Sequence, residues 1–217
     1  MGETMDALRA EGLEAIVVAI PNADSLRPTE YTPYPAPFVD EEIHGRPGGG
    51  DRYLDFVVDV VKPLIDRSFP TLPGPEATGI IGSSLGALIS LYAFFSRPDV
   101  FGFAGAMSPG IPASQAPLFE LIGLGRVPRG RLYVDTGGRE GAILSDPQAA
   151  AALSNAFMEC VARLHRLLSK IGYSDGNDLL VVVDGKATHE EPAWASRLPG
   201  ALRFLVPRAD AQSGSRA

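Results

Sequence analysis

Short apolar runs alternate along this chain with longer stretches of helical periodicity. Apolar runs of strand length are typical of strands buried on both faces, and a helix between successive strands lets them pair in parallel. The pattern predicts an α/β fold, with a mostly parallel sheet of about five strands and helices on both faces. The expected strands are 14–20, 78–81, 103–107, 131–135 and 179–183.

Helix-end signals place the helices between these strands. Ser145 and Asp146 are followed by Pro147, an order that gives an N-cap and a proline at the first helical position. We expect that helix to run to about Lys170. The other expected helices are 52–68, 85–95 and 192–205, with a short helix within 108–130.

Residues 21–50 interrupt this alternation of strands and helices. They contain six prolines and end in the glycines 48–50. A loop of that length inside a domain is usually functional or disordered. We expect it to form a lid or wall over the site, swinging about the three glycines. We expect residues 1–207, this loop included, to form a single catalytic domain, and the small, polar tail 208–217 to be disordered.

Charge and composition exclude several classes of partner. Lys and Arg number 19 against 26 Asp and Glu, a formal net charge of −7, and no basic stripe interrupts it. Such a surface repels phosphate backbones, so nucleic acid is not expected as a partner. No apolar run reaches 18 residues, and the N-terminus is unlike a signal peptide, so neither a membrane span nor export is expected.

Cysteine and histidine are sparse. Cys160 is the sole cysteine and cannot form an internal disulfide, which is compatible with the reducing cytoplasm, the expected location. The three histidines are scattered and show no metal-ligand spacing. No metal and no cofactor are expected.

The central chemical signal is Gly82-Ser83-Ser84-Leu85-Gly86, which matches the pattern G-x-S-x-G. It lies between an expected strand and an expected helix, the context in which the pattern carries chemistry. A sharp strand-to-helix turn exposes the serine hydroxyl, and the helix start brings N–H groups to the oxygen that becomes negative during acyl transfer. A Gly/Ser-rich turn without chemistry is the alternative, but the flanking elements favour Ser84 as a nucleophile.

A serine nucleophile needs a base, and only three histidines are available. His165 lies within a helical stretch and His44 within the proline-rich loop. His189 follows the last expected strand, where the chain order serine, acid, histidine requires the base. A loop histidine without a role is the alternative reading of His189.

The acid should follow the strand 131–135. Glu140, in TGGREG, is the first choice, and Asp135, at the strand end, is the second. Asp146 is better explained as a helix cap and Asp184 as a turn residue. The acid orients the imidazole and stabilises its cation.

Three segments together resemble the putative-esterase branch of the α/β-hydrolase superfamily, which holds the esterase D, enterochelin esterase and feruloyl esterase relatives. They are GSSLGALISLYAFFSRPDVFGFAGAMSPG, LYVDTGGREG and ATHEEPAWASRLPGALRFL. The resemblance covers roughly residues 6–206 and implies a triad of Ser84, Glu140 and His189. Some relatives are described as Ser–His dyads.

One departure from these relatives concerns the oxyanion site. They carry strands before the first helix of this chain, and a loop after one of those strands supplies an oxyanion donor. Here the fold closes the gap, another chain fills it, or the sequence is a fragment. We expect residues 14–20 to pair directly with 78–81, because a buried unpaired strand edge is costly. The oxyanion donors would then be the Leu85 N–H and a group of Asn22. The rival is a homodimer formed through the exposed edge.

The expected function is a serine carboxylic-ester hydrolase acting through an acyl-enzyme on small soluble esters, with short-chain or aromatic acyl groups. Tyr31, Tyr34, Phe38 and Trp194 are candidates to line an aromatic acyl pocket, and simple loop packing explains them equally well. An acyltransferase or a peptidase would use the same residues. A catalytically inactive, truncated hydrolase that serves as an interaction module is the alternative from another class.

Overall fold

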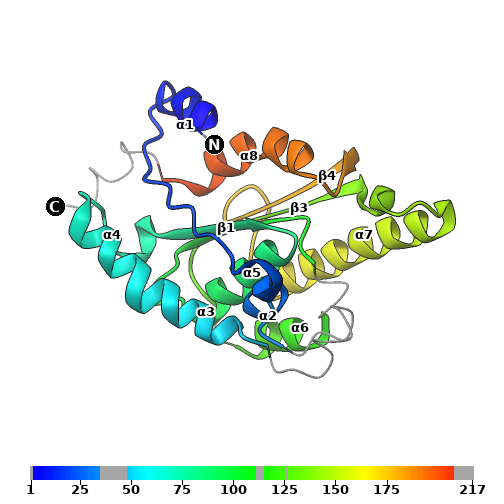
Figure 1. Ribbon diagram of the computed structural model, residues 1–217, viewed down its shortest axis with the longest axis horizontal. Coiled ribbons are helices and arrows are strands. Elements are labelled where there is room, and N and C mark those ends of the chain that lie inside the picture. The colour runs from blue at the N-terminus through cyan, green and yellow to red at the C-terminus, as the bar shows by residue number, and fades with distance from the viewer. Residues whose placement is uncertain (1, 35–47, 111–114, 126, 208–217) are drawn as a thin grey trace.

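Four strands form a parallel sheet and lie side by side in their order along the chain. The computed structural model describes residues 2–34, 48–110, 115–125 and 127–207 (Figure 1). Residues 35–47 of the expected lid and the tail 208–217 lie outside these ranges. The strands are β1 (Gly79–Ser83), β2 (Phe103–Met107), β3 (Arg131–Arg139) and β4 (Leu179–Thr188). They confirm the α/β fold and four expected strands, of which the last two run further than their apolar cores predict.

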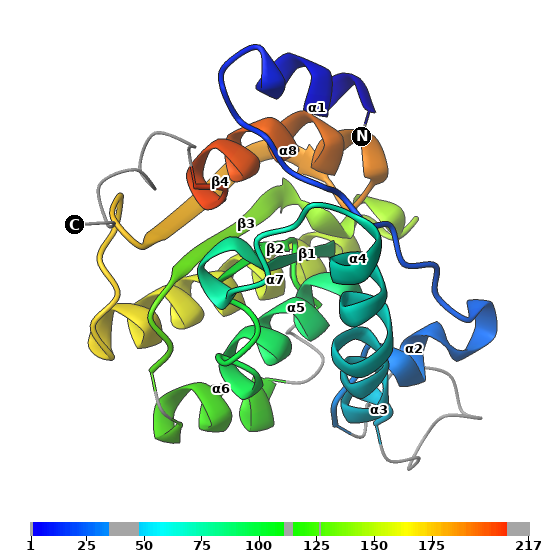
Figure 2. The same cartoon turned by 90° about the vertical axis from the view of Figure 1, so that its left-hand side faces the viewer.

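Helices cover both faces of the sheet (Figures 1 and 2). One face carries α5 (Leu85–Ser96), α6 (Gln115–Leu124) and α7 (Pro147–Lys170), and the other carries α8 (Glu191–Leu205) with α1 (Gly2–Arg9) packed on it. The expected N-cap of α7 is confirmed, because the Asp146 carboxylate accepts the Ala149 N–H at 2.9 Å. Within the described ranges, no helix combines the length and apolar character needed to cross a bilayer.

The helix expected at 52–68 forms, but its winding changes along its length. It consists of α3 (Gly50–Phe56), a π-helical segment η2 (Val57–Val61) and α4 (Lys62–Ser68). Pro63 accounts for the change, because its ring removes an N–H and collides with the carbonyl four residues earlier. The remaining short elements are η1 (Asp24–Leu26), α2 (Arg27–Glu30), η3 (Pro75–Ala77) and η5 (Glu140–Ile143).

The largest core lies between the sheet and the helices α5, α6 and α7. Leu88, Leu91 and Phe94 of α5 are fully buried there, in one cluster with Ala104 of β2 and Val134 of β3. Burying a side chain of this size stabilises the fold by about 1.5–3 kcal/mol. The packing fixes α5 against the sheet, and therefore fixes the turn that joins α5 to β1.

The strand expected at residues 14–20 is wrong, and so is its direct pairing with residues 78–81. Leu13 packs with α1 and α8, whereas Ile20 packs with α3 and α5, which lie towards the opposite face. The chain between these two anchors must therefore cross the sheet edge instead of following β1 (Figure 2). The apolar run predicted hydrophobic contact but carried no information on the direction of the chain. Within the described ranges the sheet has four strands, where about five were expected.

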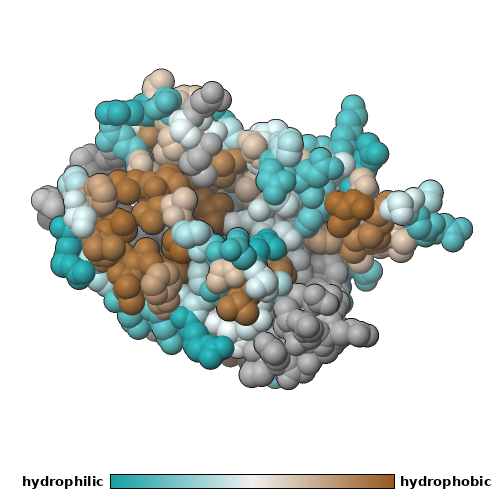
Figure 3. Space-filling model, viewed as in Figure 1, coloured by the Kyte–Doolittle hydropathy of each residue, from teal (hydrophilic) through white to brown (hydrophobic). Residues whose placement is uncertain are grey.

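A cavity of about 1150 Å³ lies between this crossing segment and β1. Ile16, Val17 and Val18 line one side and remain 49%, 44% and 40% exposed, while Ile80 and Ile81 of β1 line the other. Figure 3 shows hydrophobic surface gathered around a hollow at this end of the molecule. In the described part of the chain β1 is thus an edge strand, with its free edge facing an apolar cavity.

The backbone bonds of β1 show which of its groups face that cavity. The Thr78 carbonyl accepts the Gly102 N–H at 3.0 Å, and the Ser84 N–H donates to the Met107 carbonyl at 2.9 Å. Alternate residues of a parallel strand bond to opposite neighbours. Gly79 and Ile81 therefore direct their N–H groups away from β2.

We predict that the amide hydrogens of Gly79 and Ile81 exchange with solvent about tenfold faster than those of Ile80 and Gly82, because only the latter pair bonds to β2. Hydrogen exchange followed by NMR measures all four amides of the same strand, so each pair serves as the control for the other. Equal protection of the four amides would show that the β1 edge is covered.

Candidate active site

Ser84 lies in the turn between β1 and α5, with φ 58° and ψ −121°. Non-glycine residues rarely adopt a positive φ, and the strain is held by bonds on both sides of the residue. The Ser84 N–H donates to Met107, and its carbonyl accepts the N–H groups of Ala87, Leu88 and Gly110. The side chain is thereby directed to the carboxyl edge of the sheet.

Of the two glycines in the G-x-S-x-G segment, one is required by sterics. A Cβ atom at Gly82 would overlap the backbone of Gly86, so the two residues can pass this closely only because Gly82 lacks a side chain. A Cβ at Gly86 would meet only the Tyr31 ring, at 4.0 Å. The tightness of the turn therefore depends on Gly82.

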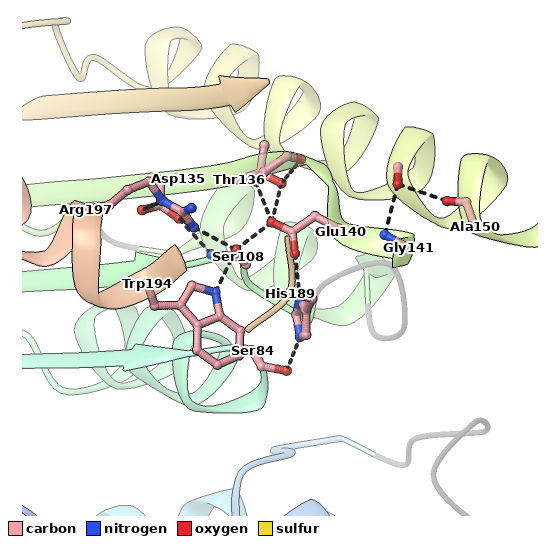
Figure 4. Close-up of polar contacts among 12 residues, drawn as sticks. Ser84, Ser108, Asp135, Thr136, Glu140, Gly141, Ala150, His189, Trp194 and Arg197 are labelled. Atoms are coloured by element: carbon pink, nitrogen blue, oxygen red, sulfur yellow. Dashed lines mark hydrogen bonds and ion pairs between the residues drawn. The ribbon is translucent and has the colours of Figure 1, made fainter. Parts of the chain in front are cut away.

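His189 lies between β4 and α8, and its imidazole joins two other side chains. Nε2 is 2.9 Å from Ser84 Oγ, and Nδ1 is 2.6 Å from Glu140 Oε2 (Figure 4). The ring packs against Phe157 and Trp194, with centroids 5.1 and 5.0 Å away, and the side chain is only 14% exposed. These contacts hold the imidazole in one orientation.

Glu140 begins η5, just beyond the end of β3, and has no exposed surface. Besides His189, its carboxylate accepts the Ser108 hydroxyl at 2.6 Å and the backbone N–H of Gly137. A Cβ at Gly137 would overlap the Ala187 carbonyl and lie 2.9 Å from Glu140 Oε1. Glycine at 137 therefore lets the turn close over the carboxylate.

The electrostatics of Glu140 favour its ionised form. Burial alone raises the pKa of a carboxyl group, but hydrogen bonds from His189, Ser108 and Gly137 outweigh burial and lower the pKa of Glu140 below its usual value. A buried carboxylate beside an imidazole is suited to stabilise the imidazolium that forms when the base takes a proton.

Asp135, the second choice for the acid, bonds to other partners. Its carboxylate accepts Arg197 Nε and Nη2 at 2.8 and 3.0 Å, and the Tyr133 hydroxyl at 2.9 Å. Arg197 is 8% exposed and Asp135 is fully buried. Of the two candidate acids, Glu140 is the one in contact with His189.

The two expected oxyanion donors have different surroundings. Leu85 begins α5, and the N–H groups of a first helical turn lack acceptors within the helix. Asn22 is exposed, and its side chain accepts the N–H of Asp24 in a local turn. The role of Asn22 depended on pairing of 14–20 with β1, and it falls with that pairing.

The aromatic residues expected around the site are dispersed. Tyr31 packs edge-on against Tyr53 and approaches Gly86, and Tyr34 packs against Tyr92 of α5. Trp194 lies against His189. Phe38 lies outside the described residues.

A family model described as Putative esterase matches residues 1–205 of the chain. The chain belongs to this family. The expected likeness to α/β-hydrolase esterases is therefore confirmed.

The chain also matches individual relatives, over different shares of its length. It is 26% identical to Uncharacterized protein YbbA of Bacillus subtilis (strain 168) over 178 residues, 81% of this chain and 68% of that protein. It is 38% identical to the siderophore triacetylfusarinine C esterase of Aspergillus fumigatus over 64 residues, 30% of this chain and 22% of that enzyme. The chain thus matches less than a quarter of the fungal enzyme.

Solved structures share the fold. The siderophore hydrolase EstA from Aspergillus nidulans superposes with a TM-score of 0.68 at 21% identity, over 94% of this chain and 76% of that chain. An IroE-like serine hydrolase from Shewanella oneidensis gives a TM-score of 0.67 at 18% identity, over 94% and 66%. At these identities the likeness concerns the fold.

Three residues that contact the triad candidates or their neighbours were not predicted from the sequence. Ser108 bonds to Glu140, Arg197 bonds to Asp135, and Phe157 packs on His189. Ser108 carried a signal, because it follows an expected strand and so lies at the same sheet edge as Ser84. Arg197 and Phe157 lie within expected helices, where nothing in the pattern separates them from ordinary helix residues.

We predict that Glu140→Gln lowers the free energy of unfolding at neutral pH by about 1–3 kcal/mol, because buried donors lose a charged acceptor. Since folding lowers the pKa of Glu140, its contribution is complete above the pKa of the unfolded chain and is lost as the pH falls through the folded-state pKa. The difference in free energy of unfolding between the unchanged protein and Glu140→Gln should therefore become smaller at acidic pH. Urea unfolding at several pH values tests this, and a gap independent of pH would contradict it.

Proposed function

We propose that this chain is a serine hydrolase that cleaves carboxylic esters, with Ser84 as nucleophile, His189 as base and Glu140 as the acid that orients the base. The observation that carries the proposal is the unbroken hydrogen-bond chain from Ser84 Oγ through both imidazole nitrogens to Glu140 Oε2. Membership of the putative esterase family supports the same reaction class.

In the proposed acylation, Ser84 Oγ attacks the ester carbonyl carbon as its proton passes to His189 Nε2. The carbonyl oxygen becomes negative and accepts the Leu85 N–H, which points from the start of α5. His189 then gives the proton to the departing alkoxide, which leaves as the alcohol. The acyl group remains on Ser84 as an ester.

In the proposed deacylation, water replaces the alcohol as the group that His189 deprotonates. The water oxygen attacks the acyl carbon, Ser84 Oγ leaves and regains its proton from His189, and the carboxylic acid departs. Glu140 stays ionised in both half-reactions and stabilises the imidazolium. Its lowered pKa supports that state.

The proposed substrates are small esters with short or aromatic acyl groups. Trp194 beside His189 and Tyr31 beside Gly86 are the aromatic rings that support an acyl site next to Ser84. The fungal relative acts on a siderophore ester, according to its name. Aromatic and siderophore-type esters are therefore the natural compounds to compare with short-chain ones.

We predict that Ser84→Ala and His189→Ala each reduce turnover of a chromogenic short-chain ester by on the order of 10³-fold or more, and that Glu140→Ala has a smaller effect. The initial rate of chromophore release is the measurement. His165→Ala is the matched control, because His165 bonds to Asp175 on the surface. Full activity in Ser84→Ala would exclude Ser84 as the nucleophile. If the unchanged protein hydrolyses none of the esters, the alternative of a catalytically inactive interaction module is favoured.

A further inference from the structure

Ser108 lies at the centre of the polar network behind the triad. It directly follows β2 and has no exposed surface. Its φ of 45° lies in the left-handed region, which non-glycine residues rarely adopt. Its backbone N–H donates to Asp135 Oδ1 at 3.0 Å, a bond that supports this backbone conformation. The hydroxyl lies between the Asp135–Arg197 ion pair and Glu140 (Figure 4).

Neighbouring donors fix the direction of the Ser108 hydroxyl proton. Trp194 Nε1 lies 3.0 Å from Ser108 Oγ, and Arg197 Nη2 lies 3.1 Å from it. An indole N–H and a guanidinium can only donate, so each must use a lone pair of the hydroxyl oxygen. The single hydroxyl proton is therefore left for Glu140 Oε1, 2.6 Å away.

Arg197 adds positive charge behind this hydroxyl. Burial alone lowers the pKa of Arg197, but its hydrogen bonds and ion pair with Asp135 raise the pKa above its usual value. A hydroxyl that accepts a bond from a cation is polarised and becomes a stronger donor. The bond from Ser108 to the Glu140 carboxylate is of this charge-assisted kind.

The three shortest contacts of the Glu140 carboxylate are all made by donors. Ser108 and the Gly137 N–H occupy Oε1, which leaves Oε2 to face His189 Nδ1. If Glu140 were protonated, its own hydrogen would face the hydrogen of one of these donors, and that hydrogen bond would be lost. The arrangement therefore selects the ionised carboxylate and fixes its rotation.

We propose that Ser108 is a positioning residue, whose hydroxyl, held by Arg197 and Trp194, keeps Glu140 ionised and turned towards His189. The inference rests on the proposed role of Ser84, His189 and Glu140 in ester hydrolysis. Ser108 acts through Glu140 and, being fully buried, does not contact substrate. The ionisable groups that bond to Glu140 or to Ser108 are His189, Asp135 and Arg197.

The test compares Ser108→Ala and Ser108→Gly with the unchanged protein. Both variants lack the hydroxyl, and glycine accepts the left-handed backbone without strain, so it provides a folded variant if alanine does not. Active-site titration with an organophosphonate counts the competent Ser84 hydroxyls, so misfolded protein does not lower the rate per site. We expect kcat per titrated site to fall about 10- to 100-fold with KM nearly unchanged.

A second readout follows Glu140 itself. The ¹³C resonance of its side-chain carboxyl, assigned by its loss in Glu140→Gln, reports ionisation as the pH is lowered. We expect it to titrate at higher pH in both Ser108 variants than in the unchanged protein, because the carboxylate has lost a donor. Ser90→Ala is the control, since Ser90 is likewise buried and, among the described residues, its hydroxyl donates to the Gly86 carbonyl and not to Glu140. In this control, the Glu140 carboxyl resonance should titrate at the same pH as in the unchanged protein.

The outcomes separate this inference from the proposed function. If the unchanged protein hydrolyses esters but either Ser108 variant keeps its kcat, or the Glu140 titration does not move, the positioning role is overturned. If the unchanged protein hydrolyses no ester, the proposed function fails, and the catalytic meaning of the Ser108 contact fails with it. The Glu140 titration then still shows whether the hydroxyl keeps this carboxylate ionised.

Discussion

The ionised carboxylate of Glu140 has no exposed surface, and a charge in that position must be satisfied by donors from the protein. These donors come from three separate parts of the chain: the end of β2, the end of β3 and the loop before α8. The carboxyl ends of neighbouring parallel strands lie at one edge of the sheet, so the fold brings the three parts together. The position of the imidazole, and through it the Ser84 hydroxyl, depends on this buried charge.

A second buried carboxylate lies on the far side of Ser108. Asp135 is neutralised by a two-bond ion pair with Arg197, and it contacts the backbone N–H of Ser108. Asp135 and Glu140, five positions apart near the end of β3, thus have separate partners: the Arg197 guanidinium and, in the proposed mechanism, the imidazolium form of His189. Of these two buried acids, Asp135 therefore has a structural role in the ion pair, and Glu140 is free to take part in the proposed chemistry.

Local sequence signals predicted the parts of the site that depend on local geometry. The glycines around Ser84, the apolar strands and the position of His189 after the last strand were sufficient to select residues that the structure brings within hydrogen-bonding distance. Residues 14–20 were misassigned because an apolar run does not say which face its ends pack against, and Leu13 and Ile20 are anchored to different clusters. The bonds of Ser108 and Arg197 depend on tertiary contacts across 89 and 62 positions, beyond the reach of any local pattern.

Covalent labelling shows whether Ser84 is an activated nucleophile. A fluorophosphonate reacts with a serine hydroxyl only when a base activates it, and mass spectrometry of peptides locates the adduct. We expect one adduct, on Ser84, which is lost in His189→Ala although Ser84 is still present. No adduct on the unchanged protein, or an adduct on Ser83 or Ser108 instead, would contradict the assignment of Ser84 as the activated nucleophile.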